Sequence, residues 1–125
     1  MPSAPIPKND ADRLADLHSY RILDTPPEES FDDLTRLAAY ICQAPISLIS
    51  LVDKHRQWFK SACGIDLSEE PRRQAFCGYT ILDNVPMIVE DATVDDRVKD
   101  NPLVLDEPKI RFYAGIPLTS PRGYN

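Results

Sequence analysis

The uncharged stretch from Leu37 to Val52 places the strongest constraint on how this chain can fold. It is 16 residues long and is interrupted by Gln43 and Pro45, whereas a helix that crosses a bilayer needs about 20 apolar residues. Before Pro45 the apolar residues recur every three or four positions, and after it Ile46–Val52 is a mainly apolar run with β-branched residues. The stretch therefore predicts the end of a helix followed by a buried strand, without membrane insertion.

Two helices are expected ahead of this strand. The second runs from Glu28 to Pro45 and should bury one face, which consists of Phe31, Leu34, Leu37, Ala38, Ile41 and Cys42. The first begins at Asn9, whose side chain can cap it, and ends before Pro26. Its apolar stripe is narrow and suits packing on a sheet or against the same helix of a second copy equally well; the stripe consists of Leu14, Leu17 and Tyr20.

Four strands are expected, in an α+β fold with an antiparallel sheet flanked by helices. They cover residues 46–52, 57–63, 86–89 and 110–118, and the first two form a hairpin that Gly64 closes. Both alternations of the first strand are apolar, which indicates that both of its faces are covered. The connecting segments are predicted as a polar loop, a short helix or helical turn, and a long acidic loop that covers a binding site, at residues 65–73, 74–82 and 91–108.

Charge and composition exclude several classes of function. The net charge of −6 is concentrated in residues 83–107, which hold eight acids and two bases, so no basic face remains for a nucleic acid. The acids lack the spacing of a calcium-binding loop and the three cysteines lack that of a zinc site, so we expect no metal and no cofactor. Residues 1–8 are proline-rich and predict a disordered lead without an export signal. We expect residues 9–125 to be a single cytoplasmic domain with free thiols.

Several segments in order resemble the GAF domains of bacterial sensor proteins, over about residues 20–123. They read ILDTPPEESFDDLTRLAAYIC, PISLISLVDKHRQWFKS, RQAFCGYTIL, IVEDATVDDR, NPLV and IRFYAGIPL. The resemblance implies a small regulatory domain, often dimeric, that sits ahead of a histidine kinase, a diguanylate cyclase or a related output module. It also implies a further apolar strand and a closing helix after the turn at 120–123. That strand would lie between strands 46–52 and 110–118, so we expect a partial domain that is marginally stable or borrows a strand from a second copy.

A ligand site is expected between the sheet and the loop at 91–108. Polar residues of that loop and of the last strand converge there beside aromatic ones; the candidate ligand-binding residues are Phe76, Cys77, Tyr79, Asp91, Arg97, Asn101, Arg111 and Tyr113. The competing interpretation is that the two arginines pair with nearby aspartates and only fix the loop. Of Trp58 and Phe59, alternation sends one to the core and leaves the other for a pocket or an interface.

The candidate for a catalytic role is Cys77, at the start of a helical turn that could acidify its thiol. Its position resembles one cysteine of the free methionine sulfoxide reductases, which are catalytic GAF proteins. Those enzymes use further cysteines in the loop that corresponds to residues 91–108, and this loop has none. A buried structural thiol is therefore the favoured interpretation. No Cys-His pair for a bilin and no Asn-Lys-Phe-Asp-Glu signature for a cyclic nucleotide is present.

The predicted function is a sensory or regulatory module of bacterial signal transduction, for example in a two-component system with a sensor histidine kinase. It would bind an unknown small molecule or form a homodimer, without catalysis of its own and without an output domain in this chain. Two alternatives stay open at this point: a thiol-dependent sulfoxide reductase that uses Cys77, and a dimerisation module without a ligand.

Overall fold

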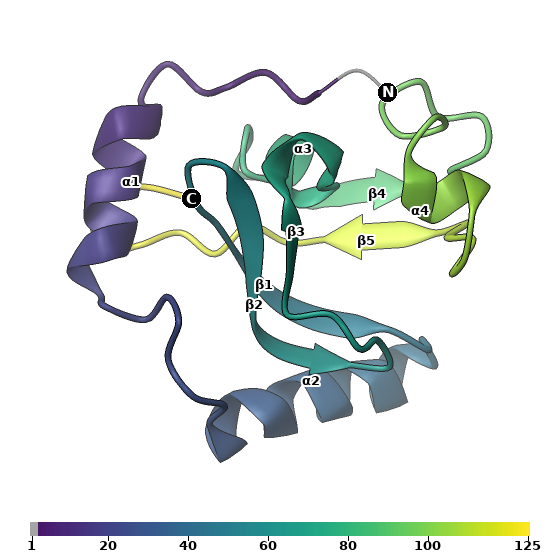
Figure 1. Cartoon of the computed structure of the whole chain (residues 1–125), viewed down its shortest axis with the longest axis horizontal. Coiled ribbons are helices and arrows are strands. Elements are labelled where there is room, and N and C mark those ends of the chain that lie inside the picture. Colours follow the sequence, from purple (N-terminus) through teal and green to yellow (C-terminus); the bar gives the residue numbers. More distant parts are fainter. Residues whose placement is uncertain (1–2) are drawn as a thin grey trace.

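The computed structural model describes residues 3–125 and has two antiparallel sheets surrounded by short and medium helices (Figure 1). The helices are α1 (Asp10–Ser19), α2 (Glu29–Cys42), η1 (Arg72–Gln74), α3 (Cys77–Thr80) and α4 (Pro102–Leu105). The strands are β1 (Ser47–Val52), β2 (Arg56–Cys63), β3 (Glu69–Pro71), β4 (Met87–Val89) and β5 (Tyr113–Gly115). One sheet has the order β1-β2-β3 and the other pairs β4 with β5. The predicted α+β class with antiparallel pairing is confirmed.

The β1–β2 hairpin contains a β-bulge. Ile49 pairs with Ser61 and Ser50 pairs with Phe59, so Lys60 has no partner residue in the ladder. The extra residue breaks the alternation of β2, and five successive side chains, from Gln57 to Ser61, are buried. Trp58 and Phe59 are consequently both part of the core rather than one of them lining a pocket.

The bulge residue Lys60 ties the linker between α1 and α2 to the sheet. Its ammonium group is buried and donates to Thr25 Oγ1 at 2.8 Å and to the carbonyl of Pro26 at 2.7 Å. It also lies 2.6 Å from Glu28 Oε2 and 5.5 Å from the centre of the Phe31 ring. A buried charge needs such partners to offset its desolvation.

Helix α2 packs on the hairpin through a polar contact, and the predicted apolar face is wrong. Thr35, its one buried residue, lies 2.8 Å (Oγ1 to Oγ) from Ser61, and Ser61 donates to Asp32 at 2.6 Å. The side chains of Leu34, Leu37, Ala38, Ile41 and Cys42 are exposed. The hairpin lies under the Asp32–Thr35 side of the helix, and no described element covers the leucine side.

Glycine is required where β2 ends. Gly64 has φ +84°, and a Cβ atom there would lie 1.8 Å from the carbonyl oxygen of Pro45. Helix α2 itself ends at Cys42, three residues before Pro45, and its C-cap residue Gln43 adopts the left-handed conformation that often terminates helices. Pro45 thus follows the helix end and packs against the returning strand, as its backbone contact with Gly64 shows.

Helix α1 also differs from its predicted packing. Asn9 makes no side-chain cap, and the buried residues of the helix are the charged Arg13 and Asp16. Leu14 and Leu17 are half-buried and Tyr20 is exposed. The helix is held by ion pairs instead of an apolar stripe: Asp10 accepts from Arg13 at 2.8 Å and from Arg72 at 2.9 Å.

The second sheet covers the main apolar core. Its buried cluster joins β4 to the acidic loop and consists of Phe76, Met87, Val89, Ala92, Val98 and Val104. Strand β5 is shorter than predicted. The short helix or helical turn predicted at 74–82 is α3, the acidic loop contains one turn of helix, α4, and η1 lies mainly in the predicted polar loop. The polar loop predicted at 65–73 contains β3, which pairs with β2.

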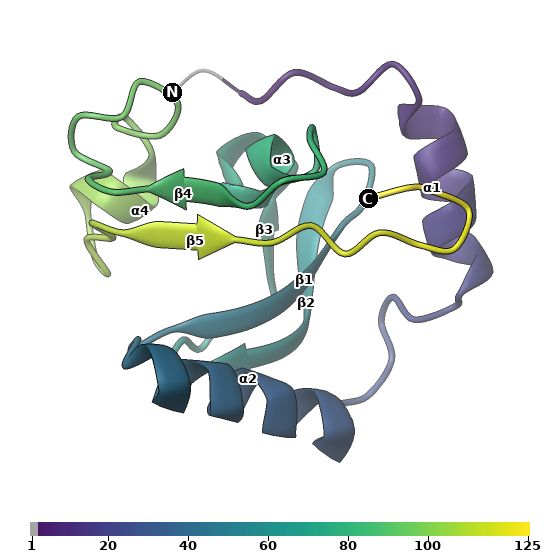
Figure 2. The ribbon, with the colours of Figure 1, turned by 180° about the vertical axis from the view of Figure 1, so that it is seen from behind.

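The two sheets lie at different levels, with α2 on the outer face of the hairpin and α1 across one end (Figures 1 and 2). Within the described residues, no helix is long and apolar enough to cross a membrane. Of the predicted lead, residues 1–2 lie outside the described part, and residues 3–8 run as an extended segment past α3 (Figure 2). A disordered lead and a single domain over residues 9–125 stay predictions.

Replacing Lys60 by Met should lower the free energy of unfolding by about 1–3 kcal/mol, because three oxygen partners lose a charged donor while the packing of the stem is kept. Urea denaturation followed by tryptophan fluorescence measures the difference. Lys54→Met in the exposed hairpin turn is the control and should change stability by less than about 0.5 kcal/mol. Equal stability of the two variants would contradict the anchoring role of Lys60.

Candidate functional site

A cavity of about 1310 Å³ lies between β1 and β5. Its walls come from α1, α2, β1, α3 and the segment from Pro108 to Asn125. Most of the lining is aliphatic or aromatic, and one group of polar side chains lies beside α3. An apolar cavity with a few convergent polar groups is the usual form of a small-molecule site.

The polar groups under α3 form a hydrogen-bonded chain of neutral side chains. The Cys77 Sγ atom lies 3.1 Å from Ser50 Oγ and 3.4 Å from the Tyr113 hydroxyl. The Tyr113 hydroxyl lies 2.8 Å from Thr80 Oγ1, and the Tyr113 ring packs on Phe76 with 5.0 Å between ring centroids. These hydrogen-bonded side chains therefore join β1, α3 and β5 across one wall of the cavity.

The position of the Tyr113 hydroxyl depends on Gly115. A Cβ atom at Gly115 would lie 2.2 Å from this hydroxyl and 2.9 Å from Thr80 Oγ1. Only a residue without a side chain therefore lets the phenol reach over its own strand to α3. Gly115 is part of the segment IRFYAGIPL, but the residue pattern alone does not indicate that a glycine is required there.

Burial keeps this group uncharged. Desolvation raises the pKa of the Cys77 thiol, against the hydrogen bonds from Ser50 and Tyr113, which lower it. Desolvation likewise raises the pKa of the Tyr113 phenol. Both groups are protonated at neutral pH, so Cys77 is a weak nucleophile here and lacks the acidified thiol that the catalytic alternative requires.

Glu70 of β3 lies at the same cavity and was missed by sequence reasoning. It accepts a hydrogen bond from Gln57 Nε2 at 2.9 Å, and burial raises its pKa to about 7. Ser50, Thr80 and Gln57 were missed as well. None of them stands in a recognisable motif, because their roles arise from contacts between elements distant in sequence.

The structure separates the eight candidate residues into two groups. Four of them line the cavity, namely Phe76, Cys77, Arg111 and Tyr113. Arg111 lies at the exposed rim, where its guanidinium donates to the carbonyl of Val104 at 2.9 Å. The side chains of the other four are not part of the cavity wall; these are Tyr79, Asp91, Arg97 and Asn101.

Three of those four make local contacts that shape the acidic loop. Arg97 pairs with Asp95 at 2.7 Å, and this hydrogen bond raises the pKa of Arg97. Asn101 is fully buried, caps α4 through the amide of Leu103 and donates to the carbonyl of Gln74. Asp91 accepts from Thr93, and these hydrogen bonds lower its pKa. Such contacts support the interpretation that these groups fix the loop.

Three buried polar atoms along the cavity have no hydrogen-bond partner among the described residues. They are Arg13 Nη2, Asp16 Oδ1 and Gln57 Oε1. The nearest charge to Asp16 is Arg122 Nη1, at 3.7 Å. Buried polar groups are paired in most proteins, with protein groups or with water, so unpaired atoms such as these are uncommon.

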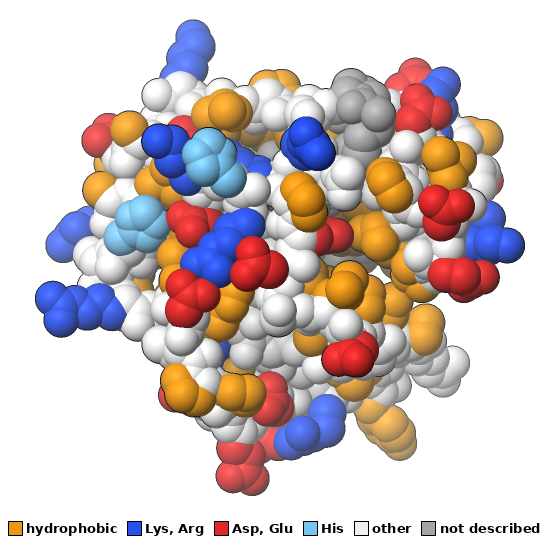
Figure 3. All heavy atoms as spheres, viewed as in Figure 1, with side chains coloured by type: hydrophobic (Ala, Val, Ile, Leu, Met, Phe, Trp, Pro, Cys, Tyr) orange, Lys and Arg blue, Asp and Glu red, His pale blue; other side chains and the backbone are white. Residues whose placement is uncertain are grey.

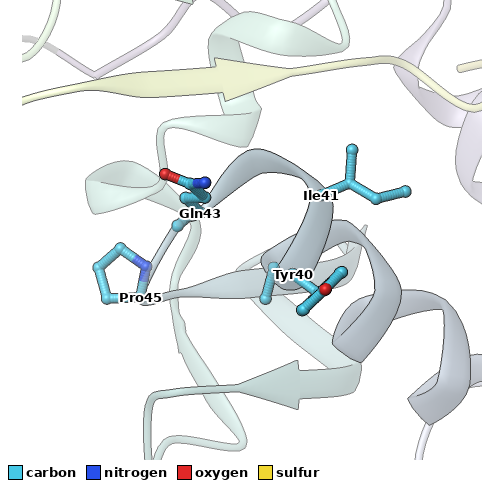
Figure 4. A pocket seen from close by; sticks show the side chains of 6 residues that line it. Tyr40, Ile41, Gln43 and Pro45 are labelled. Carbon is cyan, nitrogen blue, oxygen red and sulfur yellow. The ribbon is translucent and has the colours of Figure 1, made fainter.

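A second hollow lies at the end of α2 and carries no evident chemistry. It is about 670 Å³, open to the solvent, and lined by residues 39–41 and 43–45, of which Figure 4 labels Tyr40, Ile41, Gln43 and Pro45. The side chains of Tyr40 and Ile41 are both exposed. None of these side chains is charged.

Metal chemistry has no support in the described part of the chain. No group of three or more His, Cys, Asp or Glu side chains there could hold an ion. The three cysteines are free thiols. On the face drawn in Figure 3, acidic and basic side chains are intermixed without a continuous basic surface.

Comparisons with known proteins agree with the architecture. A family model described as the GAF domain matches residues 26–124. A cyclic di-GMP phosphodiesterase of Pseudomonas aeruginosa is 42% identical over 125 residues, which is all of this chain and 21% of the relative. The chain thus spans about a fifth of the length of the curated relative that it matches.

The stability of the fold should fall as the pH rises from about 4.5 to about 7, through the contribution of Glu70. The folded state holds the Glu70 proton up to about pH 7, whereas the unfolded chain loses it near its ordinary value of 4.5. The folded state therefore binds more protons in this window, and stability decreases with pH. Urea midpoints of the wild type and of Glu70→Gln at pH 5 and pH 7.5 measure this contribution.

Glu70→Gln should remove part of the difference between the two midpoints. The matched control is Glu69→Gln, because Glu69 is exposed on the same strand and its replacement should leave the Glu70 contribution in place. A wild-type pH dependence that survives Glu70→Gln unchanged would show that other groups carry it.

Proposed function

Because the chain belongs to the GAF family, we propose that it is the sensory module of a bacterial signalling protein and that it binds a small, largely apolar molecule in the cavity beside Cys77 and Tyr113. The observation that carries the proposal is the neutral hydrogen-bonded chain of Ser50, Cys77, Tyr113 and Thr80 along an apolar wall. Neutral hydroxyl and thiol groups suit an uncharged ligand with one or two hydrogen-bonding atoms.

Ligand binding would act by changing the balance between two arrangements of the domain. The hydrogen-bonded side chains of Ser50, Cys77 and Tyr113 link β1, α3 and β5, and β1 and β5 belong to different sheets. A ligand that bonds to these groups in only one arrangement shifts the population toward it. The proposed site is narrower than the one predicted from the sequence, since it uses Cys77, Tyr113 and the rim residue Arg111 rather than the acidic loop.

The output that this module regulates is proposed from the relative. The Pseudomonas protein is named as a cyclic di-GMP phosphodiesterase, and the match covers 21% of it. This supports an output module of cyclic di-GMP turnover. A histidine kinase output, a two-component system and a cytoplasmic location stay predictions.

A dimerisation module without a ligand is the second candidate function. The observation that favours it is the exposed apolar side of α2, where Leu34, Leu37, Tyr40 and Ile41 are each more than half exposed. Such a contiguous patch is typical of interaction surfaces.

Native mass spectrometry of the freshly purified chain tests the two candidates together. Ligand binding predicts a small-molecule mass on the wild type and about tenfold weaker retention in Tyr113→Phe, which loses one hydrogen bond. Tyr40→Phe, at an exposed tyrosine that does not line the cavity, is the control and should retain the ligand. A ligand-free dimer that becomes monomeric in Leu37→Lys would instead establish the dimerisation module.

The chain should not reduce free methionine sulfoxide with a thiol reductant. Cys77 is buried and its raised pKa keeps the thiol protonated, while residues 91–108 contain no further cysteine. A coupled assay of methionine formation measures this, with Cys77→Ser as the control. Turnover that disappears in Cys77→Ser but persists in Cys42→Ser would overturn the assignment as a non-enzyme.

A further inference from the structure

We propose that α1 is a lid over one end of the cavity, held closed by ion pairs and hinged at residues 20–24. Its buried residues Arg13 and Asp16 line the cavity, so a movement of the helix changes access to the space between β1 and β5. The helix lies across one end of the molecule, and both of its ends continue into segments without regular structure (Figures 1 and 2).

A two-pronged ion pair holds the N-terminal end of the lid. Arg72 donates to both carboxylate oxygens of Asp10, with 2.9 Å in each bond. The hydrogen bond from Arg72 lowers the pKa of Asp10, and the two side chains are only 10% and 13% exposed. By contrast, Leu14 and Leu17 of the same helix are only half-buried. Little apolar area therefore opposes opening once the ion pair is broken.

A second network of charges holds the C-terminal end of α1 to the turn between β1 and β2. His18 Nε2 lies 3.0 Å from Asp53 Oδ1, and Arg56 donates to the two oxygens of Asp24 at 2.8 and 2.7 Å. Arg56 also donates to Asp53 at 3.2 Å, which joins the two contacts. Figure 3 shows acidic and basic side chains gathered between α1 and the hairpin. Asp24 is 66% exposed, so dissolved salt screens this network.

The hinge is assigned to the turn after α1 because its backbone is strained. Arg21 has φ +51° and Asp24 has φ +62°, which residues other than glycine rarely adopt. Such conformations cost free energy and persist where surrounding contacts hold them, and the hydrogen bonds from Arg56 to Asp24 are such contacts. Directly after the hinge, Lys60 binds residues 25–26. The linker therefore stays on the sheet while the helix moves.

The inference concerns access to the cavity and not the molecule that occupies it, so it goes beyond the proposed function. Opening of α1 is measured on the chain without any ligand. If no ligand is found, the lid can still be demonstrated. If the lid does not open, the proposed ligand site keeps its own test at Tyr113.

Amide hydrogen exchange tests whether α1 opens separately from the rest of the chain. A helix of ten residues is marginal alone in water, so its amides exchange once it leaves the body. We expect Asp10→Asn and Arg72→Gln each to speed exchange in α1 by at least about tenfold, while α2 keeps its rate. The matched controls are Asp12→Asn and Arg73→Gln, at exposed neighbouring positions. Unchanged exchange in Asp10→Asn, or equal acceleration in α1 and α2, overturns the proposal.

Access to the cavity is measured at the Cys77 thiol, which lines it. With Cys42→Ser and Cys63→Ser, Cys77 is the single thiol of the chain, and its reaction with the uncharged disulfide dithiodipyridine is followed by absorbance. A lid predicts that Asp10→Asn speeds this reaction by the same factor as exchange in α1. Faster exchange in α1 without a faster reaction at Cys77 overturns the proposal, because α1 then does not control access.

Ionic strength tests whether ion pairs are what keeps the lid closed. Raising NaCl from about 0.05 M to about 0.5 M should speed exchange in α1, relative to α2, about two- to fivefold, because exposed ion pairs are screened. Asp24→Asn lacks one such pair and should show a smaller effect of salt. Slower exchange at high salt, or an equal effect in the wild type and in Asp24→Asn, overturns the proposal.

Discussion

The antiparallel ladder between β1 and β2 is the interaction on which the other elements of the structure depend. α2 is fixed to one side of it through Thr35 and Ser61, and α3 to the other through Cys77 and Ser50. β3 extends the ladder at its outer edge, and Lys60 holds the linker that leads from α1 to α2. Because these attachments are hydrogen bonds at defined positions, they orient the elements more narrowly than apolar contacts of the same size would.

Sequence patterns predicted those parts of the fold that depend on local residues. The apolar run after Pro45 and the polar turn after Val52 were sufficient for the hairpin, and periodicity was sufficient for the existence of α2. The buried face of α2 could not be predicted, because Thr35 is buried by a partner on β2 that periodicity does not include. β3 was missed for a similar reason: Glu69 and Glu70 have low strand propensity, and their pairing is imposed by the adjacent edge of β2.

The candidate site shows the same division between local and distant information. Cys77 and Tyr113 were recognised from their segments, but Ser50 and Thr80 contribute only because the fold brings three elements together. Arg97 and Asn101 looked equally suitable in the sequence, and both use their polar groups to shape the loop. A polar residue in a long loop is therefore weak evidence for binding until its own neighbours are known.

The bulge at Lys60 has a consequence for how the chain folds. When the side chains of a hairpin alternate regularly, one strand can shift along the other and still form backbone hydrogen bonds, which produces misregistered species during folding. Here a slipped ladder would move the extra residue away from Thr25 and Pro26 and would leave the Lys60 ammonium buried without partners. A wrong register therefore costs the free energy of burying an unpaired charge. The linker ahead of α2, which supplies the partners of Lys60, thus favours the correct pairing of β1 with β2, although both strands follow it in the sequence.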